Sequence, residues 1–280
     1  MPVSQAIPAN PPPASTNPFT GTECATRPLA RLKRVNGRTR LTRLVPLLAA
    51  MSLLVGAPVA AANPPAPPEP ILPPPVQPAN VGDLKTAAVD YYDSGAYLTD
   101  LQLATAPAIT WIDDEAPVVD RPAVVFDIDE TSLSNWPAIE ANDFGRIIDG
   151  PCVAPPKGPC GWRAWDLRAQ STVIAPTMDV FTTARDHGAA IFFITGRDES
   201  QRAATERNLA AVGYHGYSGL IMEPVGAQYA SAADFKAPQR AHLEAQGYTI
   251  IANLGDQPSD LDGGFAERTY LLPNPFYRIP

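Results

Sequence analysis

After Pro122, short apolar runs alternate with longer segments of helical periodicity, and this alternation limits the fold more than any other feature of the chain. The apolar runs have the length of strands, and they are 123–129 (AVVFDID), 191–195 (IFFIT), 219–222 (GLIM), 248–255 (YTIIANLG) and 269–272 (TYLL). Helix candidates lie between them at 176–187, 199–212 and 234–246. Strands that are apolar throughout are buried on both faces, and helical crossovers between such strands produce a parallel sheet. The sequence therefore predicts an α/β fold with helices on both faces of the sheet.

Two segments fall outside this alternation. Residues 83–105 carry apolar side chains at helical spacing, which predicts one or two amphipathic helices that pack against the sheet. The first two strands are separated by more than sixty residues, and 134–174 holds two cysteines, three tryptophans and five prolines. Long insertions in compact domains are usually functional. We therefore expect an inserted cap at about residues 134–174.

The N-terminal part of the chain has the pattern of an export signal. Residues 27–43 carry seven Lys or Arg and no acidic residue, an apolar run follows at 44–61, and Ala60-Ala61-Ala62 supplies an A-x-A cleavage site. A membrane anchor is the alternative, but the run is shorter than the ~20 residues needed to span a bilayer and contains two prolines. We expect cleavage near Ala62, with the protein secreted or in the cell envelope and not bound to a membrane.

The domain organisation follows from these segments. Residues 1–62 hold the export signal behind a disordered extension, and 63–80 form a proline-rich linker. The folded domain is expected at 81–280. Cleavage would leave 14 basic against 28 acidic residues, a charge near −14. Such a charge repels a phosphate backbone and excludes a nucleic-acid polymer as partner, whereas a small phosphate ester and a homodimer stay compatible with it.

Two cysteines would remain after cleavage. Cys152 and Cys160 lie in the Pro- and Gly-rich stretch PCVAPPKGPCG. In an oxidising compartment, a pair so close in sequence predicts a disulfide. A pair of metal-binding thiolates is the alternative, which is disfavoured because no histidine or CxxC motif lies nearby.

Polar residues follow three of the predicted strands, at the edge where an open parallel sheet binds ligands. The first strand runs into DIDET at 127–131, the second into Thr195-Gly196-Arg197 and the fourth into GDQPSD at 255–260, with Lys236 on the helix before it. Two carboxylates at the end of a core strand are costly to bury unless they bind something positive. Each residue alone could be a helix cap, a turn glycine or a solvated lysine. The functional hypothesis therefore rests on the whole set.

These motifs resemble a known family. VVFDIDETSLSN, FFITGR, FK and GDQPSD are similar, in order and spacing, to the four motifs of the haloacid dehalogenase (HAD) phosphohydrolases. More narrowly, DIDET and FKAPQRAHLEAQGYTIIANLGDQPSDL resemble the secreted class C bacterial acid phosphatases and the plant vegetative-storage acid phosphatases. The resemblance covers about residues 81–280. It implies a HAD-like Rossmannoid sheet with strand order 5-4-1-2-3 and an inserted cap.

The resemblance also implies a magnesium-dependent acid phosphatase that acts on phosphate monoesters. Asp127 would be the nucleophile. Its carboxyl group has an ordinary pKa of ~3.9 and is already ionised, so it needs positioning more than activation. Asp129 would protonate the leaving alkoxide and later deprotonate water. Mg²⁺ would be held by Asp127, the backbone carbonyl of Asp129 and Asp256, with Asp260 behind these ligands.

The remaining motif residues would bind the phosphate. Thr195 and the backbone N–H of Gly196 can donate hydrogen bonds to it, and Lys236 can offset the charge on the nucleophile and the transferring group. Arg197 would add a second cation if its side chain points inward, and the sequence leaves its direction open. Glu130 and Thr131 are expected to serve turn geometry.

Two other classes of function remain as alternatives. A phosphoacceptor receiver domain also combines Asp, Thr and Lys on a parallel sheet, but export, the D-x-D pair and the cap argue against it. A storage or binding protein of this fold would normally have lost the nucleophile, and Asp127 is present. Dehalogenases of the fold lack the metal cluster, so Asp129 and Asp256 favour phosphoryl transfer.

Overall fold

The computed structural model describes residues 78–279, so the predicted export signal and most of the proline-rich linker lie outside the described residues. The described part begins with two helices, α1 (Val81–Asp93) and α2 (Ala96–Glu115). Gly95 separates them with a left-handed φ of 81°, a conformation that glycine adopts without steric cost. The helices predicted in 83–105 are present, and α2 continues further, to Glu115. No helix among the described residues is long and apolar enough to cross a membrane.

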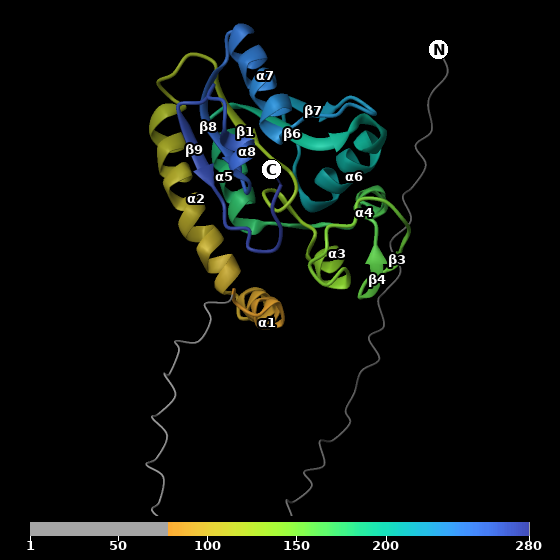
Figure 1. Ribbon diagram of the computed structural model, residues 1–280. Helices are drawn as coiled ribbons and strands as arrows, with labels where there is room; N and C mark the ends of the chain where they lie inside the picture. Colours follow the sequence, from red (N-terminus) through yellow and green to blue (C-terminus); the bar gives the residue numbers. More distant parts are fainter. Residues whose placement is uncertain (1–77, 280) are drawn as a thin grey trace, which may run out of the picture. The chain divides into compact units, whose positions relative to one another are not determined.

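The centre of the fold is a five-stranded sheet (Figure 1). Its strands are β1 (Pro122–Phe126), β6 (Ala190–Asp198), β7 (Gly219–Glu223), β8 (Thr249–Gly255) and β9 (Arg268–Leu271). The spatial order is β7-β6-β1-β8-β9, and every neighbouring pair is parallel. Numbered along the chain, this is the expected order 5-4-1-2-3, with the first strand central.

Helices cover both faces of the sheet. Those of the crossovers are α5 (Ala175–Asp186), α6 (Arg202–Val212) and α7 (Ala232–Ala245), and a short 3₁₀ helix, η1 (Glu199–Gln201), precedes α6. Val124 and Phe126 of β1 pack in one buried cluster with α2, α5 and α6. Ala123 and Val125 pack in another with α7. Because successive side chains of a strand point to opposite faces, this split places α7 on the face opposite the other three helices.

A long insertion separates β1 from α5. It contains β2 (Leu133–Ser134), α3 (Trp136–Ala141), β3 (Cys152–Ala154), β4 (Lys157–Cys160), α4 (Trp162–Arg168) and β5 (Thr172–Val173). β2 and β5 pair antiparallel, so the insertion leaves and rejoins the core at one place. β3 and β4 form a hairpin that is closed by the predicted disulfide between Cys152 and Cys160.

Aromatic side chains attach the insertion to the rest of the molecule. Trp136 stacks on Tyr92 of α1 with ring centroids 3.9 Å apart and also contacts Phe276. Trp162 meets Tyr277 edge to face at 5.2 Å. Aromatic pairs of this kind contribute about 0.5–1.5 kcal/mol beyond their buried area. The insertion is therefore held against α1 and the segment after β9.

Candidate active site

The carboxyl ends of β1, β6 and β8 open into a cavity of about 590 Å³. The insertion supplies part of its wall, through Arg146, Ile148, Trp162, Arg163 and Asp166. In an open parallel sheet, ligands bind beyond the carboxyl ends of the strands. This cavity is therefore the candidate active site.

The structure brings together most of the residues predicted from sequence. Those that line the cavity are Asp127, Asp129, Gly196, Arg197, Lys236, Asp256 and Asp260. Among the described residues that form the cavity wall, Thr195 does not appear. Thr195 is fully buried at the end of β6, and its Oγ1 accepts a hydrogen bond from the backbone N of Arg197 at 3.1 Å.

The turn after β1 directs two carboxylates into the cavity. Ser132 Oγ donates to the backbone O of Asp127 at 2.7 Å, and Glu130 adopts a positive φ of 54° that closes the turn. Ile128, between the two aspartates, is fully buried in the core. Since neighbouring residues of an extended chain point to opposite sides, the burial of Ile128 leaves Asp127 and Asp129 facing the cavity.

Three of the carboxylates form a cluster around a lysine. Asp127, Asp256 and Asp260 each place a carboxylate oxygen within 4.8 Å of the other two, and all three are buried. Lys236 Nζ donates to Asp127 Oδ1 at 2.5 Å and to Asp260 Oδ1 at 2.7 Å. One ammonium group against three carboxylates leaves an excess of negative charge. Oxygen ligands in this number are what Mg²⁺ and similar hard cations take, so the donor set fits a divalent metal.

The pKa values of the clustered carboxyl groups reflect this excess of negative charge. Burial raises the pKa of Asp127 well above its usual range, Lys236 acts against this, and the nearby carboxylates add to it. Burial likewise raises the pKa of Asp256 to about 7, with a further contribution from Asp260. Burial opposes the charge on Lys236, but Asp127 and Asp260 outweigh it and raise the lysine pKa. A bound cation would favour the ionised carboxylates.

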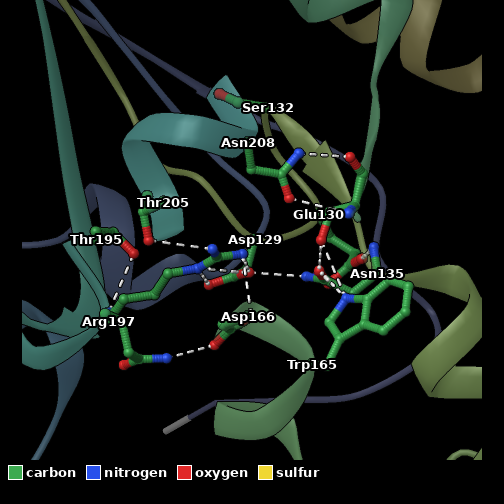
Figure 2. Close-up of polar contacts among 12 residues, drawn as sticks. Asp129, Glu130, Ser132, Asn135, Trp165, Asp166, Thr195, Arg197, Thr205 and Asn208 are labelled. Carbon is green, nitrogen blue, oxygen red and sulfur yellow. Dashed lines mark hydrogen bonds and ion pairs between the residues drawn. The ribbon is translucent and has the colours of Figure 1, made fainter. Parts of the chain in front are cut away.

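Asp129 is not one of the three clustered carboxylates. Figure 2 shows its contacts with Arg197 and Asn135. Arg197 Nη2 donates to Asp129 Oδ1 at 2.6 Å, and Arg197 Nε lies 3.2 Å from both carboxylate oxygens. Asn135 Nδ2 donates to the same Oδ1 at 2.8 Å. Burial favours the neutral form of Asp129, but Arg197 and Asn135 outweigh burial, so the pKa of Asp129 is lowered. The two aspartates of the D-x-D pair thus have opposite electrostatic surroundings.

The segment after β9 completes the site. Asn274 Nδ2 donates to Asp256 Oδ2 at 2.6 Å, and Tyr277 OH donates to Glu130 Oε2 at 2.6 Å. Further along, the backbone N of Ile279 donates to the side chain of Gln257 at 3.0 Å. These bonds hold Asp256 and the turn after β1 from one side.

Glu130 and Thr131 do more than the predicted turn geometry. Thr131 Oγ1 donates to Asp256 Oδ1 at 3.1 Å. Glu130 is buried, and it accepts hydrogen bonds from the backbone N and the side chain of Asn135. Burial raises the pKa of Glu130 to about 8, and the charge of Asp129 adds to that shift. Both residues therefore belong to the hydrogen-bond network of the site.

The backbone of β6 is irregular where the phosphate was expected to bind. Thr195 pairs with Met222 of β7, but the next pair joins Asp198 to Glu223, so the register shifts over Gly196 and Arg197. Residues inside such a bulge are released from the regular ladder. A Cβ on Gly196 would lie 3.6 Å from a carboxylate oxygen of Glu223, which is ordinary contact. Gly196 itself is exposed and lines the cavity, so its cavity side is open.

Several residues of the site carried no signal in the sequence. Asp166, Asn274 and Tyr277 lie outside the four motifs and come from the insertion or from the segment after β9. Asn135 alone had a signal in the sequence, since it ends the stretch VVFDIDETSLSN. The direction of Arg197, which the sequence left open, is toward Asp129 and Asp166.

Comparison with known proteins assigns the family. A family model described as "HAD superfamily, subfamily IIIB (Acid phosphatase)" matches residues 75–280. The stem 28 kDa glycoprotein of Glycine max is 30% identical over 69% of this chain and 74% of its own length. Acid phosphatase 1 of Solanum lycopersicum is 29% identical over 57% of this chain and 60% of its own, and vegetative storage protein 1 of Arabidopsis thaliana 29% over 56% and 55%.

A solved structure has the same fold. The crystal structure of a class C acid phosphatase from Bacillus anthracis with tungstate bound matches with a TM-score of 0.56 and 21% identity, over 71% of this chain and 86% of that one. The match confirms the α/β fold predicted from the strand pattern. With the family match over residues 75–280, it identifies the chain as a member of the HAD superfamily, subfamily IIIB, the acid phosphatases, which are phosphoric monoester hydrolases.

Proposed function

We propose that this acid phosphatase is secreted, requires Mg²⁺ and hydrolyses small phosphate monoesters through a phosphorylated Asp127, with Asp129 as acid and base. The observation that carries the proposal is the different surroundings of the two aspartates. Asp127 lies in the carboxylate cluster with Lys236, whereas Asp129 is held outside it by Arg197 and Asn135. A cation bound by the cluster would favour the ionised form of Asp127, which is the form that attacks phosphorus.

In the first half-reaction, an Asp127 carboxylate oxygen bonds to phosphorus and the phosphorus–oxygen bond to the alcohol breaks. Asp129 gives its proton to the departing alkoxide. In the second, Asp129 takes a proton from water, the water oxygen bonds to phosphorus, and the acyl phosphate bond of Asp127 breaks. Inorganic phosphate is released and both carboxylates return to their starting states. Proton transfer by a positioned side chain contributes about 10²- to 10⁴-fold in rate.

The cations of the site offset the charge of the phosphate. Lys236 contacts the nucleophile and can follow the charge that develops on the transferring group, and the open face of Gly196 offers a backbone N–H to a phosphate oxygen. Mg²⁺, held by Asp127, Asp256 and the backbone carbonyl of Asp129, would neutralise phosphate and carboxylate charge and orient the ester. Asp260 would hold Lys236 in place.

Two variants test the division of roles. Asp127→Asn removes the attacking oxygen, so no covalent intermediate forms from p-nitrophenyl phosphate. Asp129→Asn keeps the nucleophile, and the p-nitrophenolate leaving group barely needs a proton, so the aspartyl phosphate forms slowly and persists. Rapid quench with ³²P-labelled substrate, followed by peptide mapping, distinguishes the two. Label on Asp129, or on no aspartate of the wild type, would overturn the mechanism.

Export has its own test. The basic stretch 27–43, the apolar run and the alanines at 60–62 support cleavage near Ala62. The intact mass of protein recovered from the medium or the cell envelope should correspond to an N-terminus near Asn63, with Cys152 and Cys160 joined. Material that retains residues 1–62 would contradict the cleavage.

A storage protein with weak activity is the second candidate function. The observation in its favour is the similarity to vegetative storage protein 1. Turnover of p-nitrophenyl phosphate decides between the two, because typical enzymes turn over at about 1–10³ s⁻¹. A rate that Asp127→Asn leaves unchanged would favour storage.

A further inference from the structure

We propose that Asp166, in the insertion, is a positioning residue that orients the carboxylate of Asp129 through Arg197. The proposal rests on the proposed role of Asp129 as acid and base. Asp166 lies on α4, Arg197 on β6 and Asp129 on the turn after β1. Three separate parts of the chain therefore meet at one guanidinium group (Figure 2).

The Arg197 side chain is held between the two carboxylates. Its Nη2 lies 2.6 Å from Asp129 Oδ1 and 3.2 Å from Asp166 Oδ1, and its Nη1 donates to Thr205 Oγ1 at 3.3 Å. Only 3% of Arg197 is exposed. A guanidinium is a rigid fork with five N–H donors, so contacts on one side fix the direction of the donors on the other. Asp166 and Thr205 thus fix how Arg197 meets Asp129.

Asp166 is suited to this role and not to substrate binding. It is 1% exposed, and Gln201 Nε2 donates to its Oδ2 at 2.7 Å. On the cavity wall it lies next to Arg197, which contacts its Oδ1, while its Oδ2 accepts the hydrogen bond from Gln201. A buried carboxylate is costly without a paired cation, and Arg197 supplies that cation. This ion pair is made by the same Nη2 that donates to Asp129 Oδ1, so Asp166 and Asp129 share one nitrogen of the guanidinium group and its position depends on both carboxylates.

The same helix supports Asp129 from its other side. Trp165, next to Asp166 on α4, donates from Nε1 to Asn135 Oδ1 at 2.9 Å, and Ser171 Oγ donates to the same oxygen at 2.6 Å. These bonds orient the Asn135 amide, whose Nδ2 donates to Asp129 Oδ1. Asp129 Oδ1 thus accepts the short hydrogen bonds. Within the described part of the chain, Oδ2 accepts one hydrogen bond, from Arg197 Nε at 3.2 Å. Asp129 Oδ2 is the oxygen left to carry the catalytic proton.

A mispositioned Asp129 has a specific kinetic signature. Loss of proton transfer slows the release of an alkoxide much more than the release of p-nitrophenolate, because the alkoxide is the far stronger base. A general loss of structure slows both substrates alike. The ratio of the two rates therefore separates positioning from stability.

The test variant is Asp166→Asn, which keeps the shape of the side chain and removes its charge. Single-turnover release of p-nitrophenol should stay within about 3-fold of the wild type, and release of alcohol from propyl phosphate should fall about 10- to 100-fold, a part of the full effect of an acid. The KM for propyl phosphate should not change. Equal slowing of both substrates, or no slowing of either, would overturn the proposal.

Asp198→Asn is the matched control. Asp198 on β6 is 5% exposed and pairs with Arg163 of α4, so it also joins β6 to α4 by a carboxylate. No hydrogen bond or ion pair between Asp198 and Asp129 occurs among the described residues. This variant should leave the ratio of the two rates unchanged. If Asp166→Asn does not fold, Arg197→Lys serves in its place, because a lysine keeps the charge but cannot reach both carboxylates.

A double-mutant cycle with Asp129→Asn separates the two proposals. If Asp166 acts through Asp129, Asp166→Asn adds no further slowing of propyl phosphate in the Asp129→Asn background. Full additivity would overturn the positioning role alone. If Asp129→Asn by itself spares propyl phosphate, the proposed acid–base role of Asp129 fails first, and the positioning proposal falls with it.

Discussion

Among residues 78–279, Lys236 is the only cation that forms an ion pair with the carboxylate cluster. The loss of stability on its replacement by methionine can be worked out. Lys236 is 4% exposed and bonds both Asp127 and Asp260. Removing one partner of a buried ion pair costs about 3–5 kcal/mol, because the remaining charge is left uncompensated. For a domain of about 200 residues, 1 kcal/mol shifts Tm by about 2–4 °C, so we expect Lys236→Met to lower Tm by roughly 6–20 °C without metal.

The assay is thermal and urea unfolding in EDTA and in excess Mg²⁺. The variant leaves three carboxylates without a cation, so Mg²⁺ should stabilise the variant more than it stabilises the wild type. The difference in Tm between wild type and variant should therefore be smaller in Mg²⁺ than in EDTA. Lys157→Met is the control, since Lys157 is exposed on β4. If Lys236→Met is as stable as Lys157→Met in EDTA, or if the gap is the same in Mg²⁺, the charge argument for the cluster is refuted. Activity should be lost in both conditions.

Three further predictions concern metal, pH and the disulfide. Hydrolysis of p-nitrophenyl phosphate should have an acidic to neutral optimum, should stop in EDTA and should return with Mg²⁺; full activity of metal-free protein would contradict the metal assignment. Burial raises the pKa of Glu130 to about 8 and that of Asp256 to about 7. Between their ordinary pKa values near 4 and these raised values, the folded state binds more protons than the unfolded state. Unfolding in EDTA should therefore show stability that is highest near pH 5 and lower at pH 8, and a rise over this range would be evidence against the buried neutral carboxyls. Replacement of Cys152 and Cys160 by serine should cost no more than about 2.6 kcal/mol, the chain-entropy limit for so short a loop, and a larger loss in urea unfolding would show that the hairpin does more than close a loop.

The sequence predicted the sheet and the centre of the site well, for a physical reason. The strands that carry Asp127 and Asp256 are buried on both faces, so they read as continuous apolar runs, and the residues at their carboxyl ends must meet. Strand order followed from the family resemblance, and the structure confirms it. Helix α2 was predicted too short. Its last turns still bury Ala108 and Ile112 at helical spacing, but Pro107 lies inside the helix, and a proline usually marks the end of a helix.

The parts that escaped prediction belong to irregular segments. Asp166 and Asn135 act through contacts made across the insertion, and no periodicity in 134–174 indicates which polar side chain will be buried. Arg197 points toward Asp129 and Asp166, and the second of these lies in the insertion, so its direction could not be decided from the motifs. Thr195 lies in the expected place along the chain, yet its side chain is fully buried, since the bulge that follows it alters the backbone of β6.

The contacts of Asn274, Tyr277 and Ile279 set the order in which the site can be assembled. A chain that is synthesised or exported from its N-terminal end presents Asp127 first, about 150 residues before the side chains that brace Asp256 and Glu130. Until that last stretch has emerged, Asp256 lacks the hydrogen bond from Asn274 and Glu130 lacks the hydrogen bond from Tyr277. A chain stopped before residue 274 therefore contains Asp127 and Asp129 without the contacts that brace the neighbouring carboxyl groups.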